Sequence, residues 1–138
     1  MDILLVDDDW HSLMSLGRFL GSGGHRIDAH QDPASALDAC RNGSHDLLVS
    51  DYRLPGMDGL QLIKAVKSIQ PRIKTILYSG LYSSETLQLA RMQGVDKVLG
   101  KPIYIQELLA AIQCLSLPVS GPGPAIFKIS GRDNDVTP

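Results

Sequence analysis

The feature that most constrains the fold is the regular alternation of two kinds of segment along the chain. Short apolar runs such as Ile3-Leu4-Leu5-Val6 alternate with longer segments whose apolar residues recur at helical spacing. The first pattern is typical of a buried strand and the second of an amphipathic helix. The predicted strands are residues 2–6, 26–30, 45–50, 74–78 and 97–99. Each is followed by a predicted helix, over residues 10–20, 33–42, 59–69, 84–94 and 104–115.

Strands and helices that alternate in this way predict parallel βαβ units joined by short right-handed crossovers. We therefore expect an α/β fold, a doubly wound five-stranded parallel sheet with helices on both faces. In this arrangement the second helix, with Cys40, and the fifth helix, with Cys114, lie on opposite faces of the sheet. The two thiols would then be too far apart to form a disulfide.

Composition places the chain among ordinary globular proteins. It has 138 residues, enough for one domain, and 43% of them are hydrophobic. A net charge of −2 gives no general attraction to nucleic acid or to a membrane surface. We expect no membrane span and no signal peptide, and the two separated cysteines favour a reduced, cytoplasmic setting. The four histidines do not have metal-ligand spacing.

The composition changes after residue 116. Residues 117–123 read Leu-Pro-Val-Ser-Gly-Pro-Gly, and a polar end follows. We therefore divide the chain into a domain over residues 1–116 and a Pro/Gly-rich tail or linker over residues 117–138, which we predict to be flexible. Within the tail, residues 125–129 are the segment that could pair with the domain.

Charged residues follow three of the predicted strands. Asp7-Asp8-Asp9 follows the first strand, Asp51 follows the third, and Lys101-Pro102 comes shortly after the fifth. The carboxyl ends of parallel strands are where open α/β sheets build their sites. We therefore expect a nucleophile, an acidic metal-binding pair and a fixed cation to converge on a phosphoryl-accepting site.

The order of these motifs resembles the receiver domain of bacterial two-component response regulators, over residues 1–116. The matching motifs are Asp7-Asp8, Asp51 with Leu54-Pro55 and Gly59, Ser79-Gly80, and Lys101-Pro102. The resemblance implies the flavodoxin-like strand order 2-1-3-4-5. It also implies a cis peptide bond between Lys101 and Pro102, which is common in the family.

By this resemblance, Asp51 accepts a phosphoryl group from a sensor histidine kinase or a histidine phosphotransfer protein. Mg²⁺ is the implied cofactor, bound directly by Asp8 and Asp51, through water by Asp7, and by the Arg53 backbone carbonyl. Lys101 and the Ser79 hydroxyl would bind phosphoryl oxygens. The expected activity is signalling, with Mg²⁺-dependent self-phosphorylation from phosphodonors and weak autodephosphorylation.

Two positions depart from the receiver pattern. Receivers usually carry an aromatic residue three positions before the lysine, where this chain has Val98. Many also carry an arginine after a Glu-Leu-Leu-Ala segment in the last helix, where this chain has Ala111. We therefore expect an altered switch and a monomer or weak dimer, with protein–protein contact as the readout and no nucleic-acid binding by this chain. The chain is either a stand-alone receiver or a piece of a longer regulator or hybrid kinase.

Other interpretations of these residues remain open. Asp7-x-Asp9 resembles the nucleophile motif of haloacid-dehalogenase-type phosphohydrolases, in which Asp7 would be phosphorylated instead of Asp51. A pseudo-receiver that acts by binding alone is a third possibility. Asp9 is expected to cap a helix, and Asp58-Gly59 is expected to form a turn and a helix cap.

Overall fold

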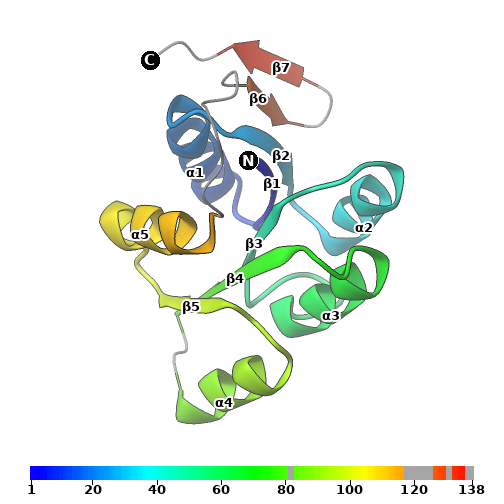
Figure 1. Cartoon of the computed structure of the whole chain (residues 1–138), viewed down its shortest axis with the longest axis vertical. Coiled ribbons are helices and arrows are strands. Elements are labelled where there is room, and N and C mark those ends of the chain that lie inside the picture. Colours follow the sequence, from blue (N-terminus) through cyan, green and yellow to red (C-terminus); the bar gives the residue numbers. More distant parts are fainter. Residues whose placement is uncertain (81–82, 117–125, 130–131, 136–138) are drawn as a thin grey trace.

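A parallel β-sheet forms the centre of the structure, a computed structural model that describes residues 1–80, 83–116, 126–129 and 132–135 (Figure 1). The five predicted strands are present, and the sheet places them in the predicted order, β2-β1-β3-β4-β5. Their bounds are β1 (Asp2–Val6), β2 (Arg26–His30), β3 (Leu47–Asp51), β4 (Lys74–Ser79) and β5 (Lys97–Gly100). Neighbouring strands in this set pair in parallel.

Five helices connect or follow these strands, as predicted. They are α1 (Trp10–Ser22), α2 (Pro33–Asn42), α3 (Gly59–Ile69), α4 (Ser84–Met92) and α5 (Ile105–Leu115). The first four begin at residues whose side chains accept a backbone N–H of the first turn, which satisfies donors that a helix start leaves unpaired. These caps are Asp9, Asp32, Asp58 and Ser83.

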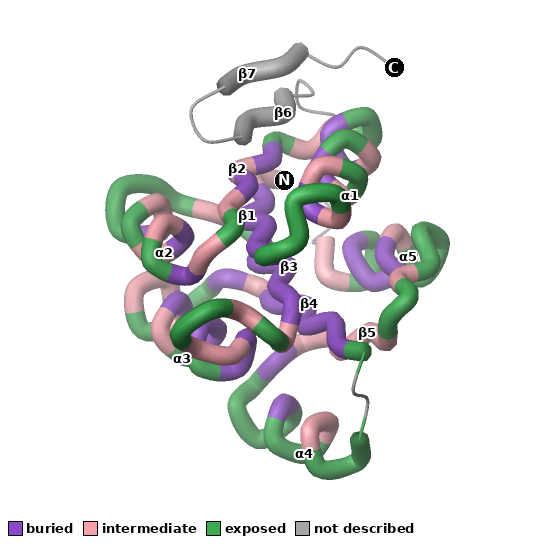
Figure 2. The backbone as a smooth tube through the Cα atoms, turned by 180° about the vertical axis from the view of Figure 1, so that it is seen from behind, coloured by how far each residue is buried: buried purple, intermediate pink, exposed green. Residues whose placement is uncertain are grey.

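The helices cover the two faces of the sheet and create two separate cores (Figures 1 and 2). On one face, α1 and α5 pack against strand residues such as Ile3, Leu5 and Tyr78. On the other face, α2, α3 and α4 pack against residues such as Leu4 and Leu48. The residues divide between the two cores in this way because successive side chains of a strand point to opposite faces of the sheet.

The two-faced arrangement also bears on the cysteines. Cys40 is buried in the core on the α2 face, whereas Cys114 is exposed on α5, and both thiols are free. The prediction that they form no disulfide is therefore confirmed in this structure.

Two further strands extend the sheet beyond β2. Strand β6 (Ile126–Ile129) pairs in parallel with β2, and β7 (Arg132–Asp135) pairs antiparallel with β6. An edge strand leaves a row of backbone N–H and C=O groups open to pairing, which explains why an added strand can dock there. The predicted flexibility of residues 117–138 stays a prediction, since residues 117–125, 130–131 and 136–138 lie outside the described part.

The strand ends determine where a site can form. In the sheet register, Val6 lies opposite Ser50, Asp51 opposite Tyr78, and Ser79 opposite Gly100. All of these residues are at the carboxyl ends of their strands, so the segments that follow them emerge at one edge. Among the helices that the structure describes, none combines the length and the apolar character needed to span a bilayer.

Candidate functional site

Asp51 is the last residue of β3 and is 4% exposed. Its Oδ2 atom accepts a hydrogen bond from the Lys101 ammonium at 2.7 Å, and its Oδ1 atom accepts the Arg53 backbone N–H at 3.3 Å. The strand brings the carboxylate to the sheet edge, while the lysine reaches it from the loop after β5. The sequence predicted that these two groups converge, and the structure brings them into direct contact.

The acidic segment after β1 divides into three different environments. Asp7 is fully buried, whereas Asp8 and Asp9 are exposed. The Asp9 side chain accepts the His11 backbone N–H and the Ser12 hydroxyl, so it caps α1 as predicted. This contact directs the Asp9 carboxylate toward the helix, while Asp7 and Asp8 remain with Asp51.

Asp7, Asp8 and Asp51 form an acidic cluster: each offers one carboxylate oxygen, and these oxygens all lie within 4.8 Å of one another. Three carboxylates at such distances repel one another unless a cation lies between them. Oxygen donors that carry negative charge are the ligands that Mg²⁺ prefers. The donor set therefore fits a hard divalent cation, with Asp8 as its solvent-exposed member.

Burial is the largest influence on the Asp7 carboxyl, and it raises the pKa of Asp7 above its ordinary value of 3.8. Hydrogen bonds from the Asp9 backbone N–H and from the Tyr78 hydroxyl lower that pKa in part, and the charge of Asp51 raises it again. The shift means that the folded protein holds the Asp7 negative charge at some energetic cost. A bound cation would relieve that cost.

Lys101 and Ser79 are held together by the backbone. The Lys101 N–H donates to the Ser79 carbonyl at 3.0 Å, and the Lys101–Pro102 peptide bond is cis, as the resemblance implied. Ser79 ends β4 and is 2% exposed. Ser79 and Lys101 therefore lie next to each other at the carboxyl end of the sheet, where Asp51 also lies.

Gly59 is required by close packing under the Asp51 backbone. A Cβ atom at this position would lie 2.4 Å from the Asp51 carbonyl oxygen and 2.6 Å from Leu77 Cδ1. Its own N–H donates to the Tyr52 carbonyl at 2.6 Å. Asp58 caps α3 in a capping box with Gln61, as expected. Any larger residue at position 59 would displace the loop that carries Arg53.

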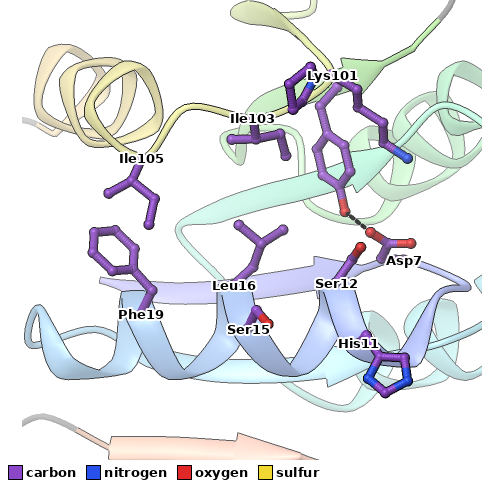
Figure 3. Close-up of a pocket in the computed structure, with 11 residues that line it drawn as sticks. Asp7, His11, Ser12, Ser15, Leu16, Phe19, Lys101, Ile103 and Ile105 are labelled. Carbon is purple, nitrogen blue, oxygen red and sulfur yellow. Dashed lines mark hydrogen bonds between the residues drawn. The ribbon is translucent and has the colours of Figure 1, made fainter.

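Tyr78 is a site residue that the sequence did not predict. Its side chain is fully buried, and its hydroxyl donates to Asp7 Oδ2 at 2.8 Å, the bond drawn as a dashed line in Figure 3. The Lys101 ammonium lies 5.3 Å from the centre of the Tyr78 ring. The available signal was an aromatic residue that follows the aliphatic pair Ile76-Leu77 and directly precedes Ser79.

A groove of about 430 Å³ opens beside this cluster, between α1 and the segment that leads into α5 (Figure 3). Asp7, Tyr78 and Lys101 line its polar end, and Leu16, Phe19 and Ile103 line its apolar part. The site is thus open on one side to solvent while its central carboxylates stay buried.

The departure at position 98 has a structural counterpart. Val98 is partly buried and packs against the core on the α2, α3 and α4 face. Tyr78 packs in the core on the opposite face. The tyrosine therefore does not take the place of the aromatic side chain that receivers usually carry at position 98. Tyr82 lies outside the described residues.

A family profile described as the response regulator receiver domain matches residues 3–113. The DNA-binding transcriptional regulator NtrC of Escherichia coli (strain K12) is 32% identical over 111 residues. That match covers 80% of this chain but 24% of NtrC, so the chain spans about a quarter of the length of this relative.

Solved structures agree with this match. A response regulator receiver domain protein (CheY-like) from Methanospirillum hungatei JF-1 is 28% identical with a TM-score of 0.77, over 81% of this chain and 90% of that one. A response regulator from Burkholderia pseudomallei is 27% identical with a TM-score of 0.76, over 81% of this chain and 66% of that one. The latter structure contains a phosphorylated aspartic acid, a calcium ion and citrate.

Proposed function

The chain belongs to the response regulator receiver domain family of two-component systems, and on that premise we propose that it accepts a phosphoryl group onto Asp51. The donor would be a phosphorylated histidine of a sensor kinase or of a histidine phosphotransfer protein. The observation that carries the proposal is the contact of the buried Asp51 carboxylate with Lys101 inside the acidic cluster. The phosphorylated aspartic acid of the Burkholderia pseudomallei relative supports the same chemistry.

In the proposed reaction an Asp51 carboxylate oxygen forms a bond to phosphorus as the nitrogen–phosphorus bond of the phosphohistidine breaks. The electron pair of that bond returns to the imidazole nitrogen. Such transfers depend mainly on positioning and on neutralising charge that is spread over the phosphoryl oxygens. Strand β3 and the Arg53 N–H hold the Asp51 carboxylate at the sheet edge, which supplies the positioning.

Lys101 supplies a fixed positive charge. Its ammonium is 2.7 Å from Asp51 Oδ2, so it already lies beside the carboxylate to which the phosphoryl group would be attached. We propose that it pairs with a phosphoryl oxygen after transfer. The Ser79 hydroxyl, on the residue whose carbonyl accepts the Lys101 N–H, would donate to a second phosphoryl oxygen.

Asp8 and Asp51 would bind Mg²⁺ directly, Asp7 would act largely through water, and the Arg53 carbonyl would complete the protein ligands. When bound, the ion would neutralise charge on both the nucleophile and the phosphoryl oxygens. The exposed position of Asp8 supports its assignment as a direct ligand, since it leaves the ion a path from solvent.

The surroundings of Asp7 argue against the haloacid-dehalogenase alternative. Its Oδ1 atom accepts the Asp9 N–H at 2.9 Å and its Oδ2 atom accepts the Tyr78 hydroxyl at 2.8 Å. Both carboxylates are buried and accept two hydrogen bonds, but the donors differ. Asp51 accepts one of its bonds from the Lys101 ammonium, a cation that can pair with a transferred phosphoryl group, whereas the donors to Asp7 are a backbone N–H and a tyrosine hydroxyl. We therefore assign Asp7 a role in orienting and binding the metal.

We propose protein–protein contact as the direct readout, through α4, β5 and α5. Large apolar side chains are exposed there: Leu89 and Met92 on α4 and Ile105 on α5, with Tyr104 directly before it. Clusters of exposed apolar side chains are typical of contact surfaces, and Leu89 and Met92 lie three residues apart on α4, so they share one side of that helix. Any further domain of a longer regulator would then respond through this surface.

The test is phosphorylation of Asp51→Asn by acetyl phosphate or by a phosphorylated kinase in the presence of Mg²⁺. The wild type should gain the mass of one phosphoryl group, and Asp51→Asn should gain none because an amide is a poor nucleophile. Asp38→Asn is the control, since Asp38 is an exposed aspartate on α2. An undiminished adduct in Asp51→Asn would contradict the assignment.

A further inference from the structure

Tyr78 connects two parts of the proposed site that come from different strands. It lies on β4 opposite Asp51 in the sheet register, but its side chain is fully buried on the α1 and α5 face. From there its hydroxyl reaches Asp7 at the end of β1. Its ring lies under the Lys101 ammonium, which in turn contacts Asp51.

The Tyr78 hydroxyl has a specific effect on the Asp7 carboxylate. Asp7 Oδ1 is fixed by the Asp9 backbone N–H, and Asp7 Oδ2 is fixed by Tyr78. Two donors on different oxygens fix the plane of a carboxylate. The lone pairs that accept neither hydrogen bond then point in fixed directions. Because Asp7 has no exposed surface, bulk water cannot replace the tyrosine as the second donor without a rearrangement.

A buried tyrosine hydroxyl always needs a hydrogen-bond partner. This need alone would be a simpler explanation of the contact between Tyr78 and Asp7. The Val6 carbonyl also lies within 3.4 Å of the hydroxyl and could serve as its acceptor. However, the shorter contact is to Asp7, a member of the acidic cluster. The same side chain also lies beneath the cation of the site, which a purely structural acceptor contact would not require.

We propose that Tyr78 is a positioning residue of the phosphoacceptor site, where its hydroxyl orients Asp7 toward the metal position and its ring supports Lys101. This inference rests on the proposed function of Asp51. Residues that orient a metal ligand by hydrogen bonding commonly contribute about 10- to 100-fold to metal affinity. Asp7 acts through water in our assignment, so we expect the lower end of that range.

The experiment compares wild type, Tyr78→Phe and Tyr104→Phe. Tyr78→Phe keeps the ring and removes only the donor, while Tyr104→Phe removes the hydroxyl of a tyrosine that is 62% exposed. Calorimetric titration with MgCl₂ should give a dissociation constant about tenfold higher for Tyr78→Phe and unchanged for Tyr104→Phe. Circular dichroism and thermal unfolding check that each variant is folded.

The phosphorylation rate separates positioning from a general structural defect. As the Mg²⁺ concentration is varied, Tyr78→Phe should require about tenfold more Mg²⁺ for half-maximal rate, with a maximal rate within about threefold of wild type. A defect of the fold would lower the maximal rate instead. Unchanged Mg²⁺ affinity in folded Tyr78→Phe would overturn the inference.

The Asp7→Asn background provides the matched control. If Tyr78 acts through Asp7, then adding Tyr78→Phe to Asp7→Asn should not weaken Mg²⁺ binding further. An equal tenfold loss in both backgrounds would also overturn the inference. If wild type binds Mg²⁺ but Asp51 is never phosphorylated, the proposed function fails, and the calorimetric comparison still reports on Tyr78 separately.

Discussion

Two regions of this molecule compensate the negative charge of aspartate side chains to very different degrees. At the carboxyl edge of the sheet, Asp7, Asp8 and Asp51 gather around one ammonium group, that of Lys101. On β2, the single carboxylate of Asp28 contacts two imidazole groups, that of His30 at 2.8 Å and that of His45 at 3.0 Å. The first group has more negative charge than one ammonium can neutralise, whereas in the second each oxygen of a single carboxylate has a histidine partner.

The pKa values of the two regions shift in opposite directions. Burial alone raises the pKa of Asp28, but the hydrogen bonds and charges of His30 and His45 outweigh it, and the pKa lies well below its ordinary value of 3.8. In Asp7, burial dominates and the pKa is raised. The Asp28 group therefore stabilises the folded state, whereas the acidic cluster works against it.

The difference indicates what each group is for. A carboxylate whose charge is already satisfied has no use for a cation, whereas an undercompensated cluster gains stability when one binds. Sites that perform chemistry commonly hold such strained arrangements, which the rest of the fold supports. We infer that the Asp28 group is part of that support and that the acidic cluster is the site.

The largest effect should come from replacing the members of the acidic segment one at a time. Asp8→Ala should weaken Mg²⁺ binding by at least about tenfold, because it removes a direct ligand. Asp9→Ala should change that affinity by less than about twofold and instead lower the stability of the fold, because Asp9 caps α1. The measurement is the fluorescence of Trp10, which begins α1 directly after the acidic segment and should therefore respond to metal binding. Equal losses of affinity in both variants would mean that the ligands are misassigned.

Stability without metal should change in opposite directions in the two regions. Asp28→Asn should lower the free energy of unfolding by about 2 kcal/mol, because it weakens two charge-assisted hydrogen bonds in a partly buried group. Asp7→Asn should raise it by a smaller amount, because it removes a buried negative charge. Urea unfolding in EDTA measures both, and destabilisation of the same size in the two variants would break the comparison.

The pH dependence of the free energy of unfolding tests the lowered pKa of Asp28, and its effect should be smaller than those above. Because its folded pKa is lowered, ionised Asp28 stabilises the protein above its unfolded value near 3.8, and this contribution is lost as the pH falls below that value. The difference between wild type and Asp28→Asn should therefore shrink as the pH falls below about 4. A difference that grows as the pH falls below about 4 would contradict the shift.

The sequence predicted the elements well because strand and helix periodicities are local. It also predicted that Asp51 and Lys101 meet, since the carboxyl ends of parallel strands share one edge. It did not predict the Tyr78 contact with Asp7, which depends on which face of β4 the ring occupies and on how far it reaches toward β1. The sequence offered residues 125–129, which contain β6, only as a segment that could pair, and it did not predict β7, because such pairing depends on an open sheet edge rather than on a local pattern.

The central claim is that Asp51, and not Asp7, accepts the phosphoryl group. The most direct measurement is to phosphorylate the wild-type protein, trap the acyl phosphate by borohydride reduction, and locate the reduced residue by tandem mass spectrometry. The account predicts reduction at Asp51 alone, and only when Mg²⁺ is present. Reduction at Asp7, with Asp51 unmodified, would contradict it and favour a phosphohydrolase that uses the acidic segment after β1.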